Sequence, residues 1–444
     1  DPDIAALVEA LGLEDDTRPV ALLLDWDRTL RGERMMLRAV LEELGYRPRS
    51  VGRDVVDALA TVWSLGLDAT LGRLLDAVVP TLVISEQVMD DAAAIRSATR
   101  DRSIPLVNVD EIAAADADTF ATTLQRVLAD LPPMQRRQPI DLQPVLSLIV
   151  PTFERPVCLR NLLDRLTLQD LPPQLFEVIV VDDGSRDPVT TWLSNARPPY
   201  RLNLRWQENA GPARARNVAI SLARAPYLLI LNDDALPARD VARRHLVAQA
   251  ASESPIAVLG SFDFDEDACA DPFTDLMQHS TLLFEYGAMT PGKLHGGRFF
   301  WTCNLSVPKA SVDAVGGFDE EYRHAICEDC DLGYRLEDEG VLVRYDPRIR
   351  SWHDHDMSLP RYLKRQRLLG RYWTRLFTKR PDLLRTIFST SGTPGFTDSL
   401  WLSLRRRYEE ERIGHTERVA EATALVNEAG TFPHGSRRRH ELLD

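Results

Sequence analysis

Short apolar runs alternate with stretches of helical periodicity over the first 140 residues of the chain. Three of the apolar runs predict buried strands, at Val20–Leu24, Thr81–Ser85 and Ile104–Val109. Three periodic stretches predict helices, at Arg34–Leu44, Val88–Thr99 and Thr119–Leu131. Alternation of this kind is typical of βαβ units, so we expect a parallel, Rossmann-like sheet here. The proline-rich stretch Leu131–Pro139 that follows predicts a linker.

A second alternation follows the linker. It predicts strands at Leu146–Val150 (stopping at Pro151), Phe176–Val181 and Tyr227–Leu231, and helices at Pro156–Leu168 and Ala213–Arg224. The polar, acidic stretch Ser261–Asp275 predicts an exposed loop, and the chain beyond Pro360 is strongly helical. We therefore expect an α/β chain in three parts: a Rossmann-like module over 1–138, a larger α/β domain over 139–360 and a helical extension over 361–444.

The composition is that of a globular protein, with 44% apolar and 27% charged residues. A net charge of −14 disfavours nucleic acid as a partner. We expect no transmembrane helix, because no apolar run approaches about 18 residues. We also expect no signal peptide at Asp1–Ile4, which lacks a basic and an apolar region. Five cysteines are typical of a reduced compartment, so a cytoplasmic location is expected.

Two of the predicted strands end in paired carboxylates, Asp182-Asp183 and Asp233-Asp234. Ligands of open α/β sheets bind beyond the carboxyl ends of the strands. Burying two like charges side by side is costly, so such pairs lie at a wet rim, take part in hydrogen bonds or bind a cation. Two pairs at equivalent strand ends of one domain favour a functional site over solvated turns.

Six segments resemble, in order, the successive motifs of family 2 glycosyltransferases. They are Ser147–Arg155, Val178–Ser185, Asn209–Asn217, Leu229–Pro237, Gly316–Glu320 and Glu328–Arg335. The resemblance covers about residues 145–357. It implies a GT-A nucleotide-sugar-binding domain, a nucleotide diphosphate sugar as donor and transfer with inversion at the anomeric carbon.

The resemblance also implies a nucleotide site. Its candidate residues are Pro151, Thr152, Glu154, Arg155, Asp182, Asp183, Arg216 and Asp233. The first four border the nucleobase and ribose, and Asp182 accepts a hydrogen bond from a pyrimidine N–H, usually that of uracil. Arg216 resembles the family's arginine near the diphosphate, and Arg214 is a second candidate. For both arginines a solvated helix face is the alternative.

Asn232-Asp233-Asp234 stands where the family carries Asp-x-Asp, so an asparagine replaces the first aspartate. The resemblance implies that Asp234 binds a metal ion. Hard oxygen ligands suit Mn²⁺ or Mg²⁺. If the segment Trp352–Asp356 is extended, His353 and His355 project to the same face. One or both join Asp234, and a nitrogen ligand favours Mn²⁺.

Asp329 is the candidate general base, because displacement at the anomeric carbon needs a carboxylate on the acceptor side. Glu328 is the alternative group for holding or deprotonating the acceptor, and Asp331 is expected to cap the helix that begins there. Cys327 and Cys330 form a CxxC without a second ligand pair, which disfavours a zinc site.

Two further segments carry patterns of their own. Leu22–Leu30 resembles the first motif of haloacid-dehalogenase-type phosphatases, with Asp25 and Asp27, but the family's lysine has no candidate in residues 1–140. A degenerate or unrelated Rossmann-like module is therefore favoured. Residues 361–380 carry eight basic and no acidic side chains. We favour a helix that packs its apolar stripe on the catalytic domain, with its arginines approaching the diphosphate, over one that lies on an anionic membrane.

Taken together, the sequence predicts a metal-dependent, inverting glycosyltransferase that moves a sugar from a UDP-sugar to a hydroxyl acceptor: a glycan, a lipid-linked acceptor or a natural product. The alternatives are a catalytically impaired nucleotide-sugar-binding module and a nucleotidyltransferase on a similar fold. Peripheral contact with the inner face of the membrane through 361–380 and an oligomeric state are left open.

Overall fold

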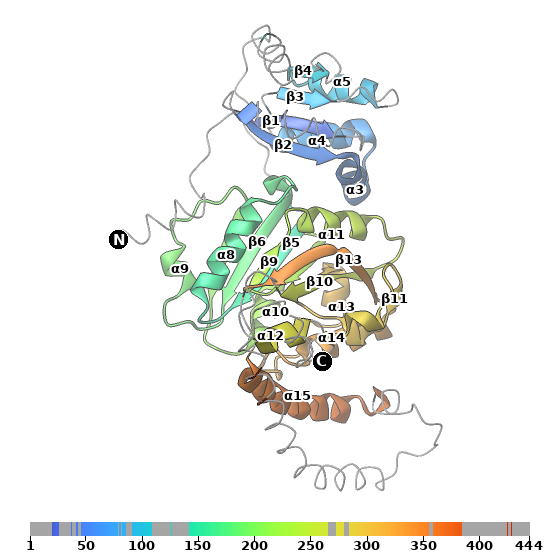
Figure 1. The fold of residues 1–444 in the computed structure, drawn as a ribbon. Coiled ribbons are helices and arrows are strands. Elements are labelled where there is room, and N and C mark those ends of the chain that lie inside the picture. The colour runs from blue at the N-terminus through green and yellow to red at the C-terminus, as the bar shows by residue number, and fades with distance from the viewer. Residues whose placement is uncertain are drawn as a thin grey trace, which may run out of the picture.

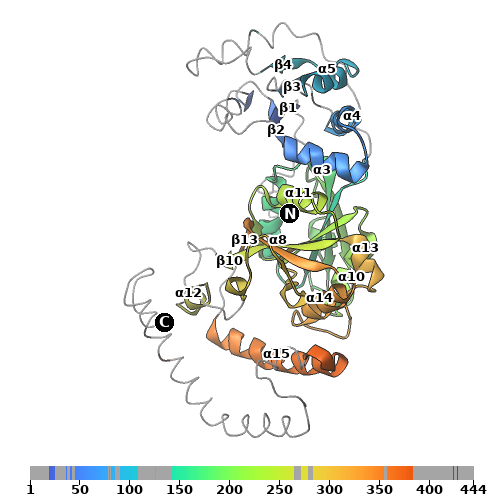
Figure 2. The same ribbon diagram turned by 90° about the vertical axis from the view of Figure 1, so that its right-hand side faces the viewer.

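The computed structural model describes residues 20–25, 46–78, 80, 82–85, 91–108, 142–264, 272–278, 284–354 and 358–383, besides positions 37, 41, 42, 126, 424 and 428. Within these residues the chain forms two sheets, one four-stranded and one nine-stranded. Figure 1 shows the smaller sheet at one end of the molecule and the larger sheet in the middle. Figure 2 shows the same order after a quarter turn.

The N-terminal sheet has the strand order β2-β1-β3-β4, and all its pairings are parallel. Its strands are β1 (Val20–Asp25), β2 (Arg47–Gly52), β3 (Leu82–Ser85) and β4 (Leu106–Asn108). Its described helices are α3 (Arg53–Trp63), α4 (Leu67–Val78) and α5 (Ala92–Arg100). The expected Rossmann-like sheet is therefore present. Sequence patterning did not predict β2, α3 or α4. For β2 the reason is that Arg47–Gly52 is too polar to be recognised as a buried strand.

The larger sheet runs β11-β13-β10-β12-β8-β5-β6-β7, and β9 pairs with β13 off this path. The strands are β5 (Leu146–Thr152), β6 (Phe176–Asp182), β7 (Arg201–Trp206), β8 (Tyr227–Leu231), β9 (Ala235–Pro237), β10 (Ile256–Phe264), β11 (Leu294–His295), β12 (Asn304–Pro308) and β13 (Leu342–His353). Strands β5, β6 and β8 are apolar runs that are buried almost throughout, as is typical of parallel strands covered on both faces.

The helices of this half are α8 (Pro156–Thr167), α9 (Val189–Trp192), α10 (Pro212–Leu222), α11 (Val241–Ala250), α12 (Pro272–Gln278), α13 (Lys309–Ala314) and α14 (Glu328–Asp338), with 3₁₀ turns η1 (Pro173–Leu175), η2 (Tyr286–Ala288) and η3 (Gly297–Phe299). The parallel order β7-β6-β5-β8 makes the boundary between β5 and β8 a topological switch point. A crevice for a ligand is expected beyond the carboxyl ends of strands at such a point.

The predicted strands and helices of this half are confirmed, with two corrections. Strand β5 continues through Pro151 to Thr152, because β8 pairs with β5 only as far as Ile149 and Pro151 therefore borders β6 alone. The predicted loop Ser261–Asp275 is wrong at both ends. Residues 261–264 finish the central strand β10, and α12 begins at Pro272. The alternation of Ser261 and Asp263 with Phe262 and Phe264 had carried the strand signal.

Several predictions lie outside the described residues. They are the linker Leu131–Pro139, nearly all of the helices Arg34–Leu44 and Thr119–Leu131, the residue Asp27 and almost all of the helical extension beyond Leu383.

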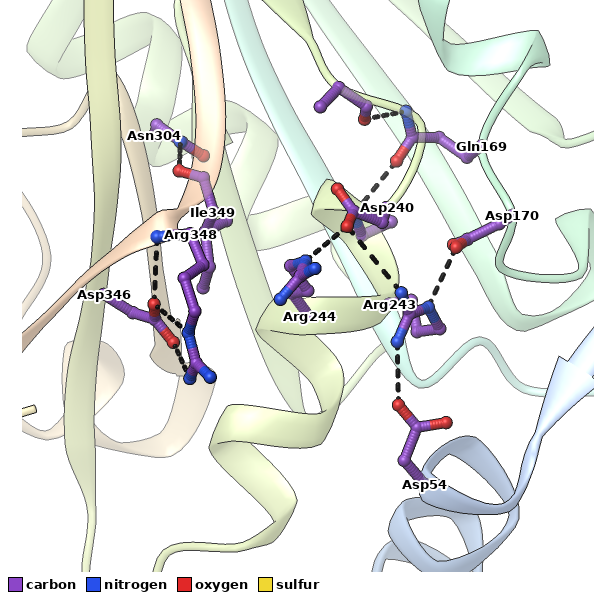
Figure 3. Close-up of polar contacts among 12 residues, drawn as sticks. Asp54, Gln169, Asp170, Asp240, Arg243, Arg244, Asn304, Asp346, Arg348 and Ile349 are labelled. Carbon is purple, nitrogen blue, oxygen red and sulfur yellow. Dashed lines mark hydrogen bonds and ion pairs between the residues drawn. The ribbon is translucent and has the colours of Figure 1, made fainter. Parts of the chain in front are cut away.

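Helix α3 of the N-terminal sheet packs on α11 of the larger domain. Arg243 on α11 donates to Asp54 of α3 (2.7 Å) and to Asp170 (2.9 Å), which Figure 3 shows as a bridge between the two halves. Asp170 follows α8, so one arginine joins three separate segments. Since these side chains are partly exposed, the ion pairs orient the two halves more than they stabilise them.

Helix α15 (Leu359–Lys379) lies at the end of the molecule opposite the N-terminal sheet (Figures 1 and 2). Among the described residues, no single helix is both long enough and apolar enough to cross a membrane. Helices α3 and α4 meet that test only when joined, and the chain bends by 101° between them.

Candidate active site

The aspartates 233 and 234 follow β8 at the switch point and are both buried, at 6% and 3% exposed. Thr152, the last residue of β5, donates its hydroxyl to Oδ2 of Asp233 (2.8 Å). Arg155 donates to Oδ2 of Asp234 (2.7 Å) and to Oδ1 of Asp233 (3.3 Å). The ends of β5 and β8 thus bring together three residues that the sequence predicted for the nucleotide site and one predicted for the metal site.

Among the described residues, one arginine contacts both carboxylates of this pair. Burial and the adjacent charge of Asp234 raise the pKa of Asp233 to about 6, although Arg155 and Thr152 oppose the rise. Two buried carboxylates that share one half-exposed arginine form a site that additional positive charge stabilises.

The pair Asp182-Asp183 is buried too, but it is bonded differently. Asp182 accepts from the backbone N–H groups of Ser185 (2.9 Å) and Val189 (3.0 Å). Asp183 accepts from the side chain of Gln207 (2.7 Å) and from the N–H groups of Ala210 (2.9 Å) and Gly211 (2.8 Å). These carboxylates close the loops that follow β6 and β7.

Two glycines allow those loops to form. Gly184 has φ +93°, and a Cβ there would come within 2.8 Å of the backbone nitrogen of Asn209. Gly211 has φ +97°, and a Cβ there would meet the carbonyl oxygen of Arg323 at 2.8 Å. Only glycine combines that backbone conformation with such close approach. Helix α10 then begins at Pro212, beside the carboxylate of Asp183.

Glu154 joins the loop after β5 to the loop after β6. Its backbone N–H donates to the hydroxyl of Ser185 (2.8 Å), and its carboxylate accepts from the N–H of Arg186 (3.1 Å). Ser185 is a residue whose part sequence reasoning missed. Its place directly after the Asp-Asp-Gly turn was the available signal.

Arg216 is only 2% exposed. It donates to Glu328 of α14 (2.7 Å) and, weakly, to the side-chain oxygen of Asn232 (3.4 Å). Arg216 thus joins the end of β8 to the first turn of α14, a contact that the sequence did not predict. Arg214, by contrast, is exposed.

Asp329 is half-buried in the first turn of α14, next to the fully enclosed Glu328. Burial and the charge of Asp329 raise the pKa of Glu328 to about 7, with Arg216 opposing. The helix begins after Cys327, which has φ +67°. Asp331 therefore does not cap the helix as predicted. It lies one turn in and pairs with Arg335 (2.9 Å).

The end of β13 lies beside Asp234, because the backbone N–H of Asp354 donates to the carbonyl oxygen of Asp234 (2.8 Å). His353 is 8% exposed, and its ring packs against Phe262 and Phe264, with centroids 3.9 and 4.6 Å away. His355 lies outside the described residues.

A divalent cation fits this site in charge and in ligand type. Asp233 and Asp234 supply hard oxygen atoms and negative charge, which are what such a cation binds. Within the described ranges, no group of three or more His, Cys, Asp or Glu side chains converges as a metal site. These two carboxylates would therefore supply only part of a coordination shell.

Comparison with known proteins decides the family. The model of glycosyl transferase family 2 matches residues 147–299. Validoxylamine A glucosyltransferase of Streptomyces hygroscopicus subsp. jinggangensis is 32% identical over 299 residues, which is 60% of this chain and 68% of that protein. The chain belongs to glycosyl transferase family 2. The larger domain accordingly has the GT-A fold, with a smaller α/β module before it and a helical region after it.

Other family 2 likenesses are partial. The chain is 32% identical to validoxylamine A glucosyltransferase of S. hygroscopicus subsp. limoneus and spans 63% of its length, less than two thirds. A structure of the mannosyltransferase PcManGT from Pyrobaculum calidifontis, in complex with GDP-Man and Mn²⁺, has a TM-score of 0.41 and 22% identity, covering 68% of this chain and 79% of that one.

Proposed function

We propose that this glycosyltransferase moves a sugar from a UDP-sugar to a hydroxyl acceptor, with inversion and with the help of Mn²⁺ or Mg²⁺. The observation that carries the proposal is the buried Asp233-Asp234 pair at the β5–β8 switch point, where one arginine faces two carboxylates. Two relatives are named validoxylamine A glucosyltransferase, which supports sugar transfer from a glucosyl donor.

The donor end of the site comprises the loops after β5, β6 and β8. Pro151, Thr152, Glu154 and Arg155 border the nucleoside, and Asp182 and Asp183 shape its pocket through the loops that they close. Asp233 faces the nucleotide, and Asp234 would hold the metal ion. The ring of His353 packs against Phe262 and Phe264 and does not converge with the two aspartates, so His355 is kept as the candidate nitrogen ligand. When bound, the ion offsets the charge of the diphosphate and so stabilises the departing nucleotide.

The acceptor end is the first turn of α14. Asp329 takes the proton of the acceptor hydroxyl while that oxygen bonds to the anomeric carbon and the bond from this carbon to the diphosphate oxygen breaks. Glu328 is too enclosed to be the main base, so it adjusts the charge beside Asp329. We assign Arg216 to holding Glu328 rather than to the diphosphate, because its guanidinium is buried against Glu328 and Asn232.

The three-part organisation is retained in the proposal, with a module over 1–138, the catalytic domain over 139–360 and the extension over 361–444. Because α3 packs on α11, we assign the N-terminal module the role of docking on the catalytic domain.

The test is release of UDP from a panel of UDP-sugars with Mn²⁺, with Mg²⁺ and with EDTA. We expect slow, metal-dependent hydrolysis of one donor, lost in Asp234→Asn and in Asp329→Asn. Asp313→Asn, an exposed aspartate on α13, is the matched control and should behave as the wild type. Turnover that EDTA leaves unchanged would overturn the metal-dependent mechanism, and UDP binding without turnover of any donor or acceptor would favour the impaired binding module.

A further inference from the structure

Helix α15 has one face committed to the catalytic domain. Leu376 is fully buried against Cys330 and Tyr334 of α14, with Trp373 and Phe377 beside it. Farther back, Leu368, Leu369 and Tyr372 pack on a cluster made of Tyr322, Ile326 and Cys327. The prediction that the apolar stripe packs on the catalytic domain is therefore confirmed. This stripe is not available to insert between lipid chains.

The basic residues at the C-terminal end and flank of the helix are paired. Arg375 contacts Glu321, Lys379 contacts Asp319, and Arg380 contacts Asp338. These three ion pairs fasten α15 to the segment before α14 and to the end of α14.

Four of the five remaining cations form an exposed row, which we call the basic face: Arg361, Lys364, Arg367 and Arg371. The fifth, Arg365, is half-buried. Steps of three, three and four residues keep them on one side of a helix. No acidic residue occurs between Leu359 and Arg380, and no acidic side chain in the described part of the chain forms an ion pair with any of the four. A chain with net charge −14 thus concentrates positive charge at one place.

Helix α15, which carries the basic face, lies on the side of the molecule opposite the N-terminal sheet, below the larger sheet (Figures 1 and 2). The helix it rests on, α14, carries Asp329 in its first turn. An external surface to which α15 binds therefore lies near α14, the helix that carries Asp329.

We propose that the basic face docks the enzyme on an anionic phospholipid surface. Four exposed cations in a row complement a layer of negative headgroups, whereas a single small anion would engage one or two of them. Because the apolar stripe is buried in the protein, the attachment is electrostatic, shallow and reversible by salt. This inference does not depend on the chemistry of transfer, since none of the four residues belongs to the proposed site.

The test is cosedimentation of the full chain with vesicles of phosphatidylcholine alone and of phosphatidylcholine with phosphatidylglycerol. We expect binding to the anionic vesicles only, with release at about 0.5 M salt, where screening is strong. Changing all four residues to alanine should weaken partitioning by several hundredfold, at about fivefold for each charge near the surface. Donor hydrolysis in solution should be retained.

The matched control removes four exposed arginines from another surface: Arg186, Arg197, Arg201 and Arg205. It changes the net charge equally and should keep vesicle binding. The proposal is overturned if the wild-type protein does not bind anionic vesicles. It is also overturned if the basic-face variant binds them as tightly as the control variant does. Binding of a soluble polyphosphate to the basic face without vesicle binding would overturn it as well, in favour of an anionic acceptor.

Discussion

The two aspartate pairs of the catalytic domain look alike in sequence and differ in what surrounds them. Asp182 and Asp183 are met almost entirely by backbone N–H groups of residues 185, 189, 210 and 211. Asp233 and Asp234 are met by the side chains of Thr152 and Arg155. A ring of backbone amides satisfies a carboxylate permanently, whereas a half-exposed arginine can leave.

The difference assigns the two pairs separate tasks. The first pair fixes the loops after β6 and β7, and its hydrogen bonds are part of the fold. The second pair places two carboxylates side by side at the switch point, where burial and the charge of Asp234 raise the pKa of Asp233. Substitutions in the first pair should therefore affect stability most, and substitutions in the second should affect turnover most.

The largest effect is expected for Asp234→Asn. Loss of the carboxylate that we propose binds the metal ion should lower turnover about 10²–10³-fold, since stabilising the leaving group accounts for several kcal/mol of the barrier. The melting temperature should hold or rise, because one of two buried like charges is removed. Activity assays and thermal melts of the same preparation measure both. A large fall in melting temperature would contradict the distinction between the pairs.

Asp183→Asn should show the opposite balance. The amide cannot accept all three hydrogen bonds, and one N–H group is left facing another donor, at a cost of about 1–3 kcal/mol. Chemical denaturation measures this loss. Asp313→Asn, an exposed residue, should show no loss. If Asp183→Asn is as stable as that control, the hydrogen bonds from backbone N–H groups to Asp183 do not contribute to the stability of the fold.

Arg155→Gln sharpens the comparison, because it removes the only side-chain cation bonded to the second pair among the described residues. We expect lower stability in EDTA and tighter Mn²⁺ binding, each by several-fold, since the freed carboxylates attract the ion more strongly. Melting curves against Mn²⁺ concentration measure both effects. An unchanged response to Mn²⁺ would show that Arg155 and the ion do not share these carboxylates.

The smallest effect concerns pH. Burial and the charge of Asp329 raise the pKa of Glu328 from 4.5 to about 7, so the negative charge of Glu328 appears through about pH 7 and turnover should rise with it. Glu328→Gln should remove that inflection and lower turnover above pH 7 by about threefold to tenfold. An inflection that persists in the variant would exclude Glu328 as its source.

The same group links pH to stability. Its folded-state pKa lies above its ordinary value, so the folded chain binds the proton more tightly. The contribution of Glu328 to the free energy of unfolding therefore falls as pH rises from about 4.5 to about 7, and Glu328→Gln should remove this slope. A slope of unfolding free energy that is equal in the variant would contradict the assignment.

Much of the catalytic fold could be predicted, because β5, β6 and β8 are continuous apolar runs bounded by polar turns. Strand β10 was harder, since its last residues alternate polar and aromatic side chains within an acidic stretch. Because the end of β10 was predicted as a loop, the contacts of the His353 ring with Phe262 and Phe264 were not predicted either.

The site could be located from the strand ends but not resolved. Sequence spacing placed Asp182-Asp183 and Asp233-Asp234 at one edge of the sheet, yet it could not say which donors reach each pair. Those donors come from turns at Gly184 and Gly211 and from a guanidinium three residues beyond Thr152. Arg216 is a similar case, because its partner Glu328 lies 112 residues away in the chain.

One measurement tests the central distinction most directly: calorimetric titration of UDP, with and without Mn²⁺, into the wild type, Asp234→Asn and Asp183→Asn. The account predicts that Mn²⁺ strengthens UDP binding to the wild type and to folded Asp183→Asn, but not to Asp234→Asn. If Mn²⁺ strengthens UDP binding equally in all three proteins, the Asp233-Asp234 pair is not the cation site.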